Sequence, residues 1–296
     1  MPVLPDYDSP TALKKFLDDR GMAMQKKFGQ NFMVNRAHRN RLIDALRLEP
    51  DMAVWEIGPG LGAMTEELLN RGARLSVFEI DRGFAAVLRD IFADREGFTL
   101  IEGDVLKTWK RAASEGVPPR LFGNLPYNIA ATIIADTISA GARFERSVFT
   151  VQKEVALRMA AVPSSEDYSS FSVLCQWAYT VTPLMDLAPG SFWPRPNVTS
   201  KAVALDRRAD WPSCESPALF MSLLRGLFSS RRKTIKNNLT PWLNAGARLA
   251  PGSEPQEIME RCFERTGIQP LARAETLSVE DFLRFSDALY ELGVTP

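Results

Sequence analysis

Between residues 52 and 151, short apolar runs alternate with segments of helical periodicity. Apolar runs of about four to eight residues are typical of strands that are buried on both faces of a sheet. The expected strands are Met52–Ile57, Arg74–Ile80, Phe98–Ile101, Arg120–Gly123 and Phe144–Val151. The expected helices between them are Ala63–Asn70, Arg82–Phe92, Val105–Ser114 and Ile129–Ser139. This alternation predicts an α/β fold with a mostly parallel sheet covered by helices on both faces.

The chain beyond this region changes in character. Phe171–Leu205 combines a helix with two further strands, and Asp206–Pro212 has the charges and prolines of a linker. From Ser216 to Glu291 the periodicity is helical, with Pro and Gly as punctuation. We therefore expect an N-terminal helix and basic arm at 1–35, an α/β domain at 36–208 and a small all-helical domain at 209–296.

Composition excludes several classes of protein. The 296 residues, 45% of them hydrophobic, supply enough apolar surface for one large domain and a smaller one. Cys175, Cys214 and Cys262 are far apart and form no CxxC pair, which argues against a disulfide framework or a zinc site. No signal peptide pattern or bilayer-length apolar run is present. We expect a cytoplasmic monomer that has no membrane partner and no metal.

Two basic segments stand out in a chain of zero net charge. Arg20–Ile43 contains six basic residues, Lys26 and Lys27 among them, and no acidic one. Arg225–Leu239 also lacks acidic residues and contains five basic ones: Arg225, Arg231, Arg232, Lys233 and Lys236. Such runs are more often solvated helix faces than binding sites. The interleaved Asn, Gln, Ser and Thr residues favour contacts with phosphates instead.

A glycine-rich segment, Glu56 to Ala63, joins the first expected strand to the next helix. Its glycines allow a tight turn and a close approach of the backbone to a ligand. Glu79 ends the next strand, where a carboxylate can accept hydrogen bonds from ribose hydroxyls. Asp104 follows the third strand, where it could meet an adenine amino group. For both acids a helix N-cap or a surface position is the alternative.

Two cofactors fit this pattern, NAD and S-adenosylmethionine, because Gly58, Gly60 and Ala63 also match the dinucleotide motif G-x-G-x-x-G/A. NAD carries a pyrophosphate, whereas S-adenosylmethionine has no phosphate and carries a sulfonium cation, which tolerates acids nearby. Glu56 directly precedes the loop, and the single histidine, His38, lies outside the sheet region. These features favour the methyl donor and leave an NAD-dependent oxidoreductase as a distant alternative.

The tetrapeptide Asn124-Leu125-Pro126-Tyr127 follows an expected strand as a loop at its end. Pro126 fixes its own φ and cannot donate a hydrogen bond, which leaves the Leu125 carbonyl free to accept one. An amide, a free carbonyl and an aromatic ring together could hold an amino group on a planar ring. An ordinary turn after a buried strand is the alternative.

Several spaced motifs together resemble the ribosomal RNA adenine dimethyltransferase family. They are Lys26–Phe32, Glu56–Gly62, Glu79, Asp104, Asn124–Tyr127, Val151–Glu154, Phe192–Ser200 and Phe228–Lys233. The resemblance implies a Rossmann-like S-adenosylmethionine-dependent methyltransferase domain, an arm at 1–35 that closes over the cofactor, and an RNA-binding helical domain at 209–296. It implies N6,N6-dimethylation of two adjacent adenines near the 3′ end of small-subunit (16S) ribosomal RNA, within an immature small ribosomal subunit.

The resemblance also implies roles for individual residues. The methyl donor would be bound by Gln30, Asn31, Met33, Gly58, Gly60, Glu79, Ile80, Asp104, Val105 and Asn124. The catalytic group would be Asn124, Leu125, Pro126, Tyr127 and Phe192, in which Tyr127 and Phe192 stack on the target base. RNA would be contacted by Lys26, Lys27, Arg231, Arg232, Lys233 and Lys236. For Phe192, a place in the core is the alternative.

Two further functions of the same fold stay open. One is a large-subunit (23S) RNA adenine methyltransferase that confers macrolide resistance. Leu125 and the long helical C-terminal region argue against it. The other is a non-catalytic ribosome assembly factor or transcription factor, which the intact Asn124 and Tyr127 disfavour. Asn197 and Thr199 depart from the family pattern, so their contacts are not assigned.

Overall fold

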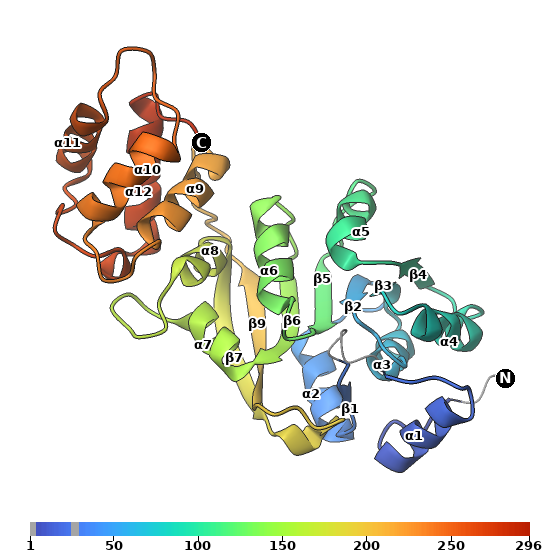
Figure 1. Cartoon of the computed structure of the whole chain (residues 1–296). Coiled ribbons are helices and arrows are strands. Elements are labelled where there is room, and N and C mark those ends of the chain that lie inside the picture. Colours follow the sequence, from blue (N-terminus) through green and yellow to red (C-terminus); the bar gives the residue numbers. More distant parts are fainter. Residues whose placement is uncertain (1–3, 25–29) are drawn as a thin grey trace. The chain divides into compact units, whose positions relative to one another are not determined.

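The computed structural model describes residues 4–24 and 30–296, which form two compact units (Figure 1). The first unit comprises the described residues up to Thr137 together with Gly141–Ala156 and Val181–Arg207. The second comprises Ile138–Ala140, Leu157–Thr180 and Arg208–Pro296. The last change of unit, between Arg207 and Arg208, lies one residue from the border expected at 208/209. The segment Leu157–Thr180 groups with the C-terminal helices, although its pattern suggested the α/β part.

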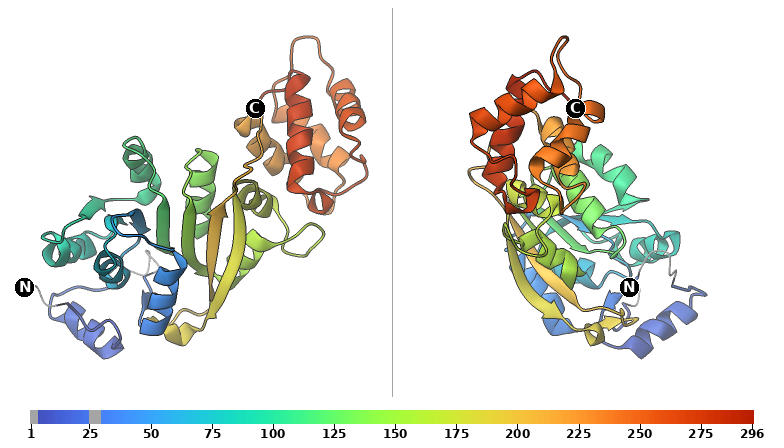
Figure 2. Two further views of the ribbon diagram at one scale, coloured as in Figure 1. Left: turned by 180° about the vertical axis from the view of Figure 1, so that it is seen from behind. Right: turned by 60° about the vertical axis from the view of Figure 1, so that its left-hand side comes forward.

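A seven-stranded sheet forms the centre of the first unit, in the order β4-β3-β2-β5-β6-β9-β7 (Figure 2). Neighbouring strands from β4 to β6 pair in parallel, and β9 pairs with β6 antiparallel. The strands are β2 (Ala53–Ile57), β3 (Arg74–Glu79), β4 (Phe98–Glu102), β5 (Arg120–Asn124), β6 (Arg146–Gln152), β7 (Tyr179–Leu187) and β9 (Ser200–Arg207). The predicted α/β fold is confirmed, and the linker expected at Asp206 begins after β9 instead.

The helices of the first unit are α1 (Pro10–Asp18), α2 (Arg36–Ala45), α3 (Ala63–Asn70), α4 (Arg82–Phe92), α5 (Val105–Ala113), α6 (Ala130–Ser139) and the start of α7 (Lys153–Ala160). The helices α3 to α6 match predicted segments to within one residue, whereas no bounds were predicted for the other three. Leu42 of α2, Leu68 of α3 and Phe92 of α4 share one apolar cluster with Val54 and Val77 of the sheet. Because successive strand residues point to opposite faces, these helices cover one face of the sheet.

The opposite face of the sheet is also packed with large side chains. Trp55 of β2 contacts Phe78 of β3 and Phe144 edge to face, with ring centroids 5.1 and 5.7 Å apart. The Trp109 indole N–H of α5 donates to Asp136 of α6 at 2.8 Å. Both faces of the inner parallel strands β2, β3, β5 and β6 are therefore buried, as their apolar runs predict, whereas the edge strand β4 has no buried residue.

A small second sheet joins two motifs that are remote in sequence. β1 (Phe32–Met33) pairs antiparallel with β8 (Phe192–Trp193), so that Met33 lies opposite Phe192. Strands of two residues have no detectable periodicity, and no local pattern indicates this pairing. The pairing brings the segment after the N-terminal arm next to the predicted second aromatic loop.

The second unit is helical among its described residues, apart from the start of β7. Its helices are α8 (Ser170–Ala178), α9 (Pro217–Leu227), α10 (Ile235–Ala245), α11 (Pro255–Thr266) and α12 (Val279–Glu291). Trp177 of α8 packs against Phe220 of α9, and Phe282 of α12 packs against Phe228. The contact between Trp177 and Phe220 explains why α8 groups with the C-terminal helices.

Gly62 begins α3 and provides the first test of the fold. Its φ is +89°, and an added Cβ would lie 2.5 Å from the buried ring of Phe92. Gly62→Ala should lower the free energy of unfolding by about 2 to 4 kcal/mol, because backbone strain and core overpacking add. Urea denaturation measures this loss.

Gly141→Ala is the matched control for Gly62→Ala. Gly141 has a similar φ of +79°, but nothing lies within 4 Å of an added Cβ. It should show the backbone cost alone, about 1 to 2 kcal/mol. Equal losses in the two variants would contradict a role for the contact with Phe92.

Candidate active site

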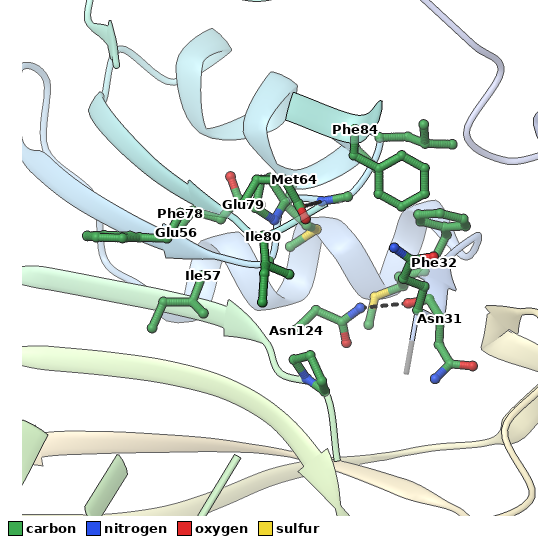
Figure 3. Close-up of a pocket in the computed structure, with 18 of the residues that line it drawn as sticks. Asn31, Phe32, Glu56, Ile57, Met64, Phe78, Glu79, Ile80, Phe84 and Asn124 are labelled. Atoms are coloured by element: carbon green, nitrogen blue, oxygen red, sulfur yellow. Dashed lines mark hydrogen bonds between the residues drawn. The ribbon is translucent and has the colours of Figure 1, made fainter. Parts of the chain in front are cut away.

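A pocket lies at the carboxyl ends of β2, β3, β4 and β5 in the first unit (Figure 3). The sheet order reverses direction at β2, with β3 on one side and β5 on the other, and such switch points form ligand crevices in α/β folds. All ten residues predicted to bind the methyl donor line this pocket. Asn124 and Pro126 of the predicted catalytic loop line it as well.

The glycine loop forms one wall of the pocket and is closed by an aromatic ring. Gly60 has a φ of +60°, and an added Cβ would lie 2.8 Å from Cε1 of Phe32. Its backbone N–H donates to Oε2 of Glu79 at 3.1 Å. The loop conformation and the Glu79 carboxylate therefore hold each other in place.

The two predicted nucleoside carboxylates differ in their local roles. Glu79 accepts hydrogen bonds from the backbone N–H groups of Gly60 and Asp81, and it is Asp81 that caps α4. Burial raises the pKa of Glu79 to about 7. Asp104 caps α5 by accepting from the Leu106 N–H at 3.0 Å, so the N-cap alternative is confirmed for Asp104. Both acids also line the pocket.

Glu56 is a third pocket carboxylate and is only 1% exposed. The Thr65 hydroxyl donates to its Oε2 at 2.7 Å. Burial raises the pKa of Glu56 to about 8, and the nearby Glu79 also acts to raise it. A cation bound between these two carboxylates would be attracted by both of them.

The amide of Asn124 is held at both of its ends. Its Nδ2 donates to the carbonyl oxygen of Asn31 at 2.8 Å, as the dashed line in Figure 3 marks. Its Oδ1 accepts from the Thr150 hydroxyl. The Leu125 N–H donates to the Thr150 carbonyl at 3.2 Å. Within residues 4–24 and 30–296, no hydrogen bond reaches the Leu125 carbonyl, which agrees with the expectation of a free acceptor.

The two predicted stacking residues lie in different environments. Tyr127 is half-buried, and its hydroxyl shares a hydrogen bond with the Ser200 hydroxyl. Burial raises the Tyr127 pKa above its ordinary value. Phe192 is only 2% exposed and packs in the apolar cluster that contains Met33 and Leu187. The core alternative therefore describes Phe192 in this structure, where β8 pairs with β1 and the ring is buried.

The predicted RNA contacts also separate into two kinds. Lys26 and Lys27 lie outside the described residues. Arg231 is paired within the second unit, where its Nε donates to Glu275 and its Nη2 donates to the Ser165 carbonyl at 2.9 Å. Its RNA contact stays a prediction, because the Arg231 side chain is still 45% exposed beside Glu275. Arg232, Lys233 and Lys236 are exposed.

The sequence reasoning missed the N-terminal wall of the pocket. Tyr7 and Leu13 line it, and the Tyr7 hydroxyl donates to the Leu61 carbonyl at 2.8 Å. Both side chains belong to an apolar cluster with Phe32 and Phe84. No motif marks Tyr7, because its partner is 54 residues away.

No group of three or more His, Cys, Asp or Glu side chains in residues 4–24 and 30–296 could hold a metal ion. None of the helices in this part of the chain is long and apolar enough to cross a membrane.

A sequence model described as ribosomal RNA adenine dimethylase matches residues 21–290. The chain belongs to this family. It is 48% identical over 288 residues to the ribosomal RNA small subunit methyltransferase A of Treponema pallidum (strain Nichols). The alignment covers 97% of this chain and 99% of that relative.

Solved structures support the same fold assignment for this dimethylase family member. A dimethyladenosine transferase from Plasmodium falciparum superposes with a TM-score of 0.74 at 23% identity, over 88% of this chain and 98% of the other. The 23S rRNA methyltransferase ErmE superposes with a TM-score of 0.60 at 23% identity, over 86% and 98% of the two chains. These likenesses concern the fold.

The raised pKa of Glu56 predicts a pH dependence of stability. The folded chain keeps a proton on Glu56 up to a pH of about 8, whereas the unfolded chain releases it near the ordinary value of 4.5. The protonated Glu56 therefore contributes to the free energy of unfolding. This stabilisation is fully present below the unfolded pKa and is lost as the pH rises through 8. The melting temperature of the ligand-free protein should therefore fall between about pH 5 and about pH 8.

Glu56→Gln should reduce this fall, because the glutamine can still accept from Thr65 but cannot titrate. Calorimetric melting at a series of pH values measures the slope. Glu115→Gln, which removes an exposed carboxylate, should retain the wild-type slope. An unchanged slope in Glu56→Gln would contradict the raised pKa.

Proposed function

We propose that this family member dimethylates N6 of adenines in small-subunit (16S) ribosomal RNA with S-adenosylmethionine as the methyl donor. The main support for this proposal is that Asn124 lines the same pocket as Glu79 and the glycine loop, and that the free Leu125 carbonyl lies next to it in the chain. The near-complete alignment with a small subunit methyltransferase supports the choice of RNA. We propose two adjacent adenines near the 3′ end as targets, modified in the cytoplasm within an immature small subunit.

The pocket residues fit the chemical parts of S-adenosylmethionine. When bound, this donor supplies an electrophilic methyl group on a sulfonium sulfur. Glu79 can accept from both ribose hydroxyls, and the second oxygen of Asp104 can accept from the adenine amino group. Glu56 and Glu79 are buried acids whose ionised forms a ligand with cationic groups would favour. Ile80, 44% exposed, can pack on the adenine ring.

Asn124 and Leu125 would position the amine of the target base. The N6 lone pair is delocalised into the adenine ring, so its geometry must be changed before it can attack. The second lone pair of Asn124 Oδ1 and the Leu125 carbonyl can each accept from one N6–H. These bonds draw the nitrogen toward a tetrahedral geometry with its lone pair facing the methyl group. After transfer, the methylated nitrogen is cationic and loses a proton to water.

Tyr127 would hold the target base by stacking. A base must leave its own stack to enter the pocket, which costs a few kcal/mol unless it is already unpaired. Stacking on one aromatic ring returns about 1 to 3 kcal/mol. The hydrogen bond to Ser200 fixes the edge of the Tyr127 ring. Because Phe192 is buried, we assign the stacking role to Tyr127.

One labelling experiment tests the proposed function. The purified protein is incubated with methyl-labelled donor and either immature small subunits or large-subunit RNA, and the digested RNA is analysed for dimethyladenosine. We expect label in the small-subunit RNA. Label only in large-subunit RNA would assign the chain to the 23S branch, and no label in either RNA would favour a non-catalytic role.

Asn124→Ala should lower the rate of methyl transfer by about 100-fold or more, because it removes one of two acceptors for the target amine. Calorimetry should show that donor binding changes by less than about threefold, which corresponds to less than about 1 kcal/mol. Asn128→Ala is the control, since Asn128 is an exposed asparagine of the same loop. Equal losses of activity in both variants would contradict the role of Asn124.

Charge removal at Lys233 and Lys236 should weaken RNA binding and reduce its salt dependence. Each lost phosphate contact lowers the slope of log K against log salt by about 0.7 for single-stranded RNA. Arg231→Gln should leave the slope unchanged, because Arg231 is paired with Glu275. Filter binding at several salt concentrations measures these slopes. An Arg231→Gln slope that matches the Lys233→Gln slope would contradict the distinction.

A further inference from the structure

We infer that Thr150 is a positioning residue for methyl transfer, because its hydroxyl fixes the orientation of the Asn124 amide. This inference rests on the proposed function, in which Asn124 Oδ1 accepts from the target amine. Thr150 lies on β6 directly opposite Asn124 of β5 in the sheet register and is fully buried. It is not among the residues that line the pocket, so its hydroxyl acts through Asn124.

Thr150 contacts both residues that would hold the target amine. Its hydroxyl donates to Asn124 Oδ1, and its backbone carbonyl accepts from the Leu125 N–H at 3.2 Å. The first contact orients the amide acceptor, and the second holds the peptide unit that precedes the Leu125 carbonyl. A single residue of the neighbouring strand therefore sets the position of both acceptors.

The surroundings of Thr150 make a hydroxyl costly unless it has this partner. Val148, Phe149 and Val151 of the same strand are fully or nearly fully buried. A hydroxyl in such an environment costs free energy when it is unpaired, whereas valine would fill the same volume without a hydrogen bond. The hydrogen bond to Asn124 offsets this cost, and it is the side-chain contact that distinguishes threonine from valine here.

The two anchors of the Asn124 amide have different chemistry. The Asn31 carbonyl can only accept, so it holds the NH2 end of the amide. Thr150 then donates to the oxygen end, and the two contacts fix the amide plane. The torsion about the last side-chain bond of asparagine is broad when it is unrestrained. Without the hydroxyl, the amide keeps one anchor, and its second oxygen lone pair is no longer aimed at one position.

Thr150→Val and Thr150→Ser separate the hydroxyl from the shape of the side chain. In Thr150→Val, kcat for methyl transfer to small-subunit RNA should fall about 5- to 20-fold, the equivalent of one hydrogen bond. KM for RNA and the donor Kd should stay within about twofold, less than about 0.5 kcal/mol. Thr150→Ser should recover kcat to within about threefold of wild type, a cost of less than about 1 kcal/mol.

Thr137→Val is the matched control. Thr137 is also a buried threonine of the first unit, but its hydroxyl donates to the Ile134 carbonyl of its own helix. This variant should keep the wild-type kcat. A loss in Thr137→Val as large as in Thr150→Val would overturn the inference, since it would reflect a general effect of removing a buried hydroxyl.

The side-chain amide signals of Asn124 give a readout that does not depend on catalysis. They are assigned by their loss in Asn124→Asp and are recorded with the donor bound. We expect one sharp pair in the wild type and in Thr150→Ser, and shifted or broadened signals in Thr150→Val. Unchanged signals and an unchanged kcat in Thr150→Val would overturn the inference.

Other outcomes are equally decisive. Weaker donor binding in Thr150→Val, or equal defects in Thr150→Val and Thr150→Ser, would show a purely structural role and overturn the inference. If the wild type methylates neither RNA, the proposed function fails. In that case the amide signals still decide whether Thr150 orients Asn124.

Discussion

The parallel pairing of β2 with β3 on one side and β5 on the other determines where the chemistry can occur. Parallel strands end at the same edge of a sheet, so Ile57, Glu79 and Asn124 meet there although they are far apart in sequence. After β2 and β3 the chain continues toward the β4 edge of the sheet, whereas after β5 it continues in the opposite direction toward β6. This divergence opens a crevice between β2 and β5. The glycine loop, the pocket carboxylates Glu79 and Asp104, and the proposed catalytic loop all depend on this arrangement.

Local sequence patterns predicted most of the fold, but they did not predict the pairings between segments that are remote in sequence. The bounds of α3 and α4 match their sequence patterns because glycine turns and the Asp81 cap mark their ends. The pocket residues at the strand ends, Gly58, Glu79, Asp104 and Asn124, were predictable because they match family motifs, whereas Tyr7 and Leu13 were not. The burial of Phe192 depends on pairing with β1, and the neutralisation of Arg231 depends on Glu275, 44 residues away. Neither partner is visible in the local sequence.

Two buried carboxylates make the local electrostatics of the pocket unfavourable when no cationic ligand is bound. Glu56 and Glu79 are 1% and 5% exposed, and burial raises the pKa of each. Backbone N–H groups and the Thr65 hydroxyl satisfy their oxygens, yet no basic side chain is hydrogen-bonded to either one in the described part of the chain. A ligand with cationic groups would relieve this burial cost more than a pyrophosphate would. The same argument favours S-adenosylmethionine over NAD.

The proposed catalytic loop, Asn124–Tyr127, is held by hydrogen bonds at both of its ends. Its first residue is fixed by Asn31 and Thr150, and the Tyr127 hydroxyl is fixed by Ser200 at the start of β9. The Pro126 carbonyl accepts from the Ile129 and Ala130 N–H groups, so the loop leads directly into α6. Between these anchors, the Leu125 carbonyl accepts no hydrogen bond from any residue that the structure describes. A substrate amine would need such an acceptor, and the bonds on either side of it keep it in position.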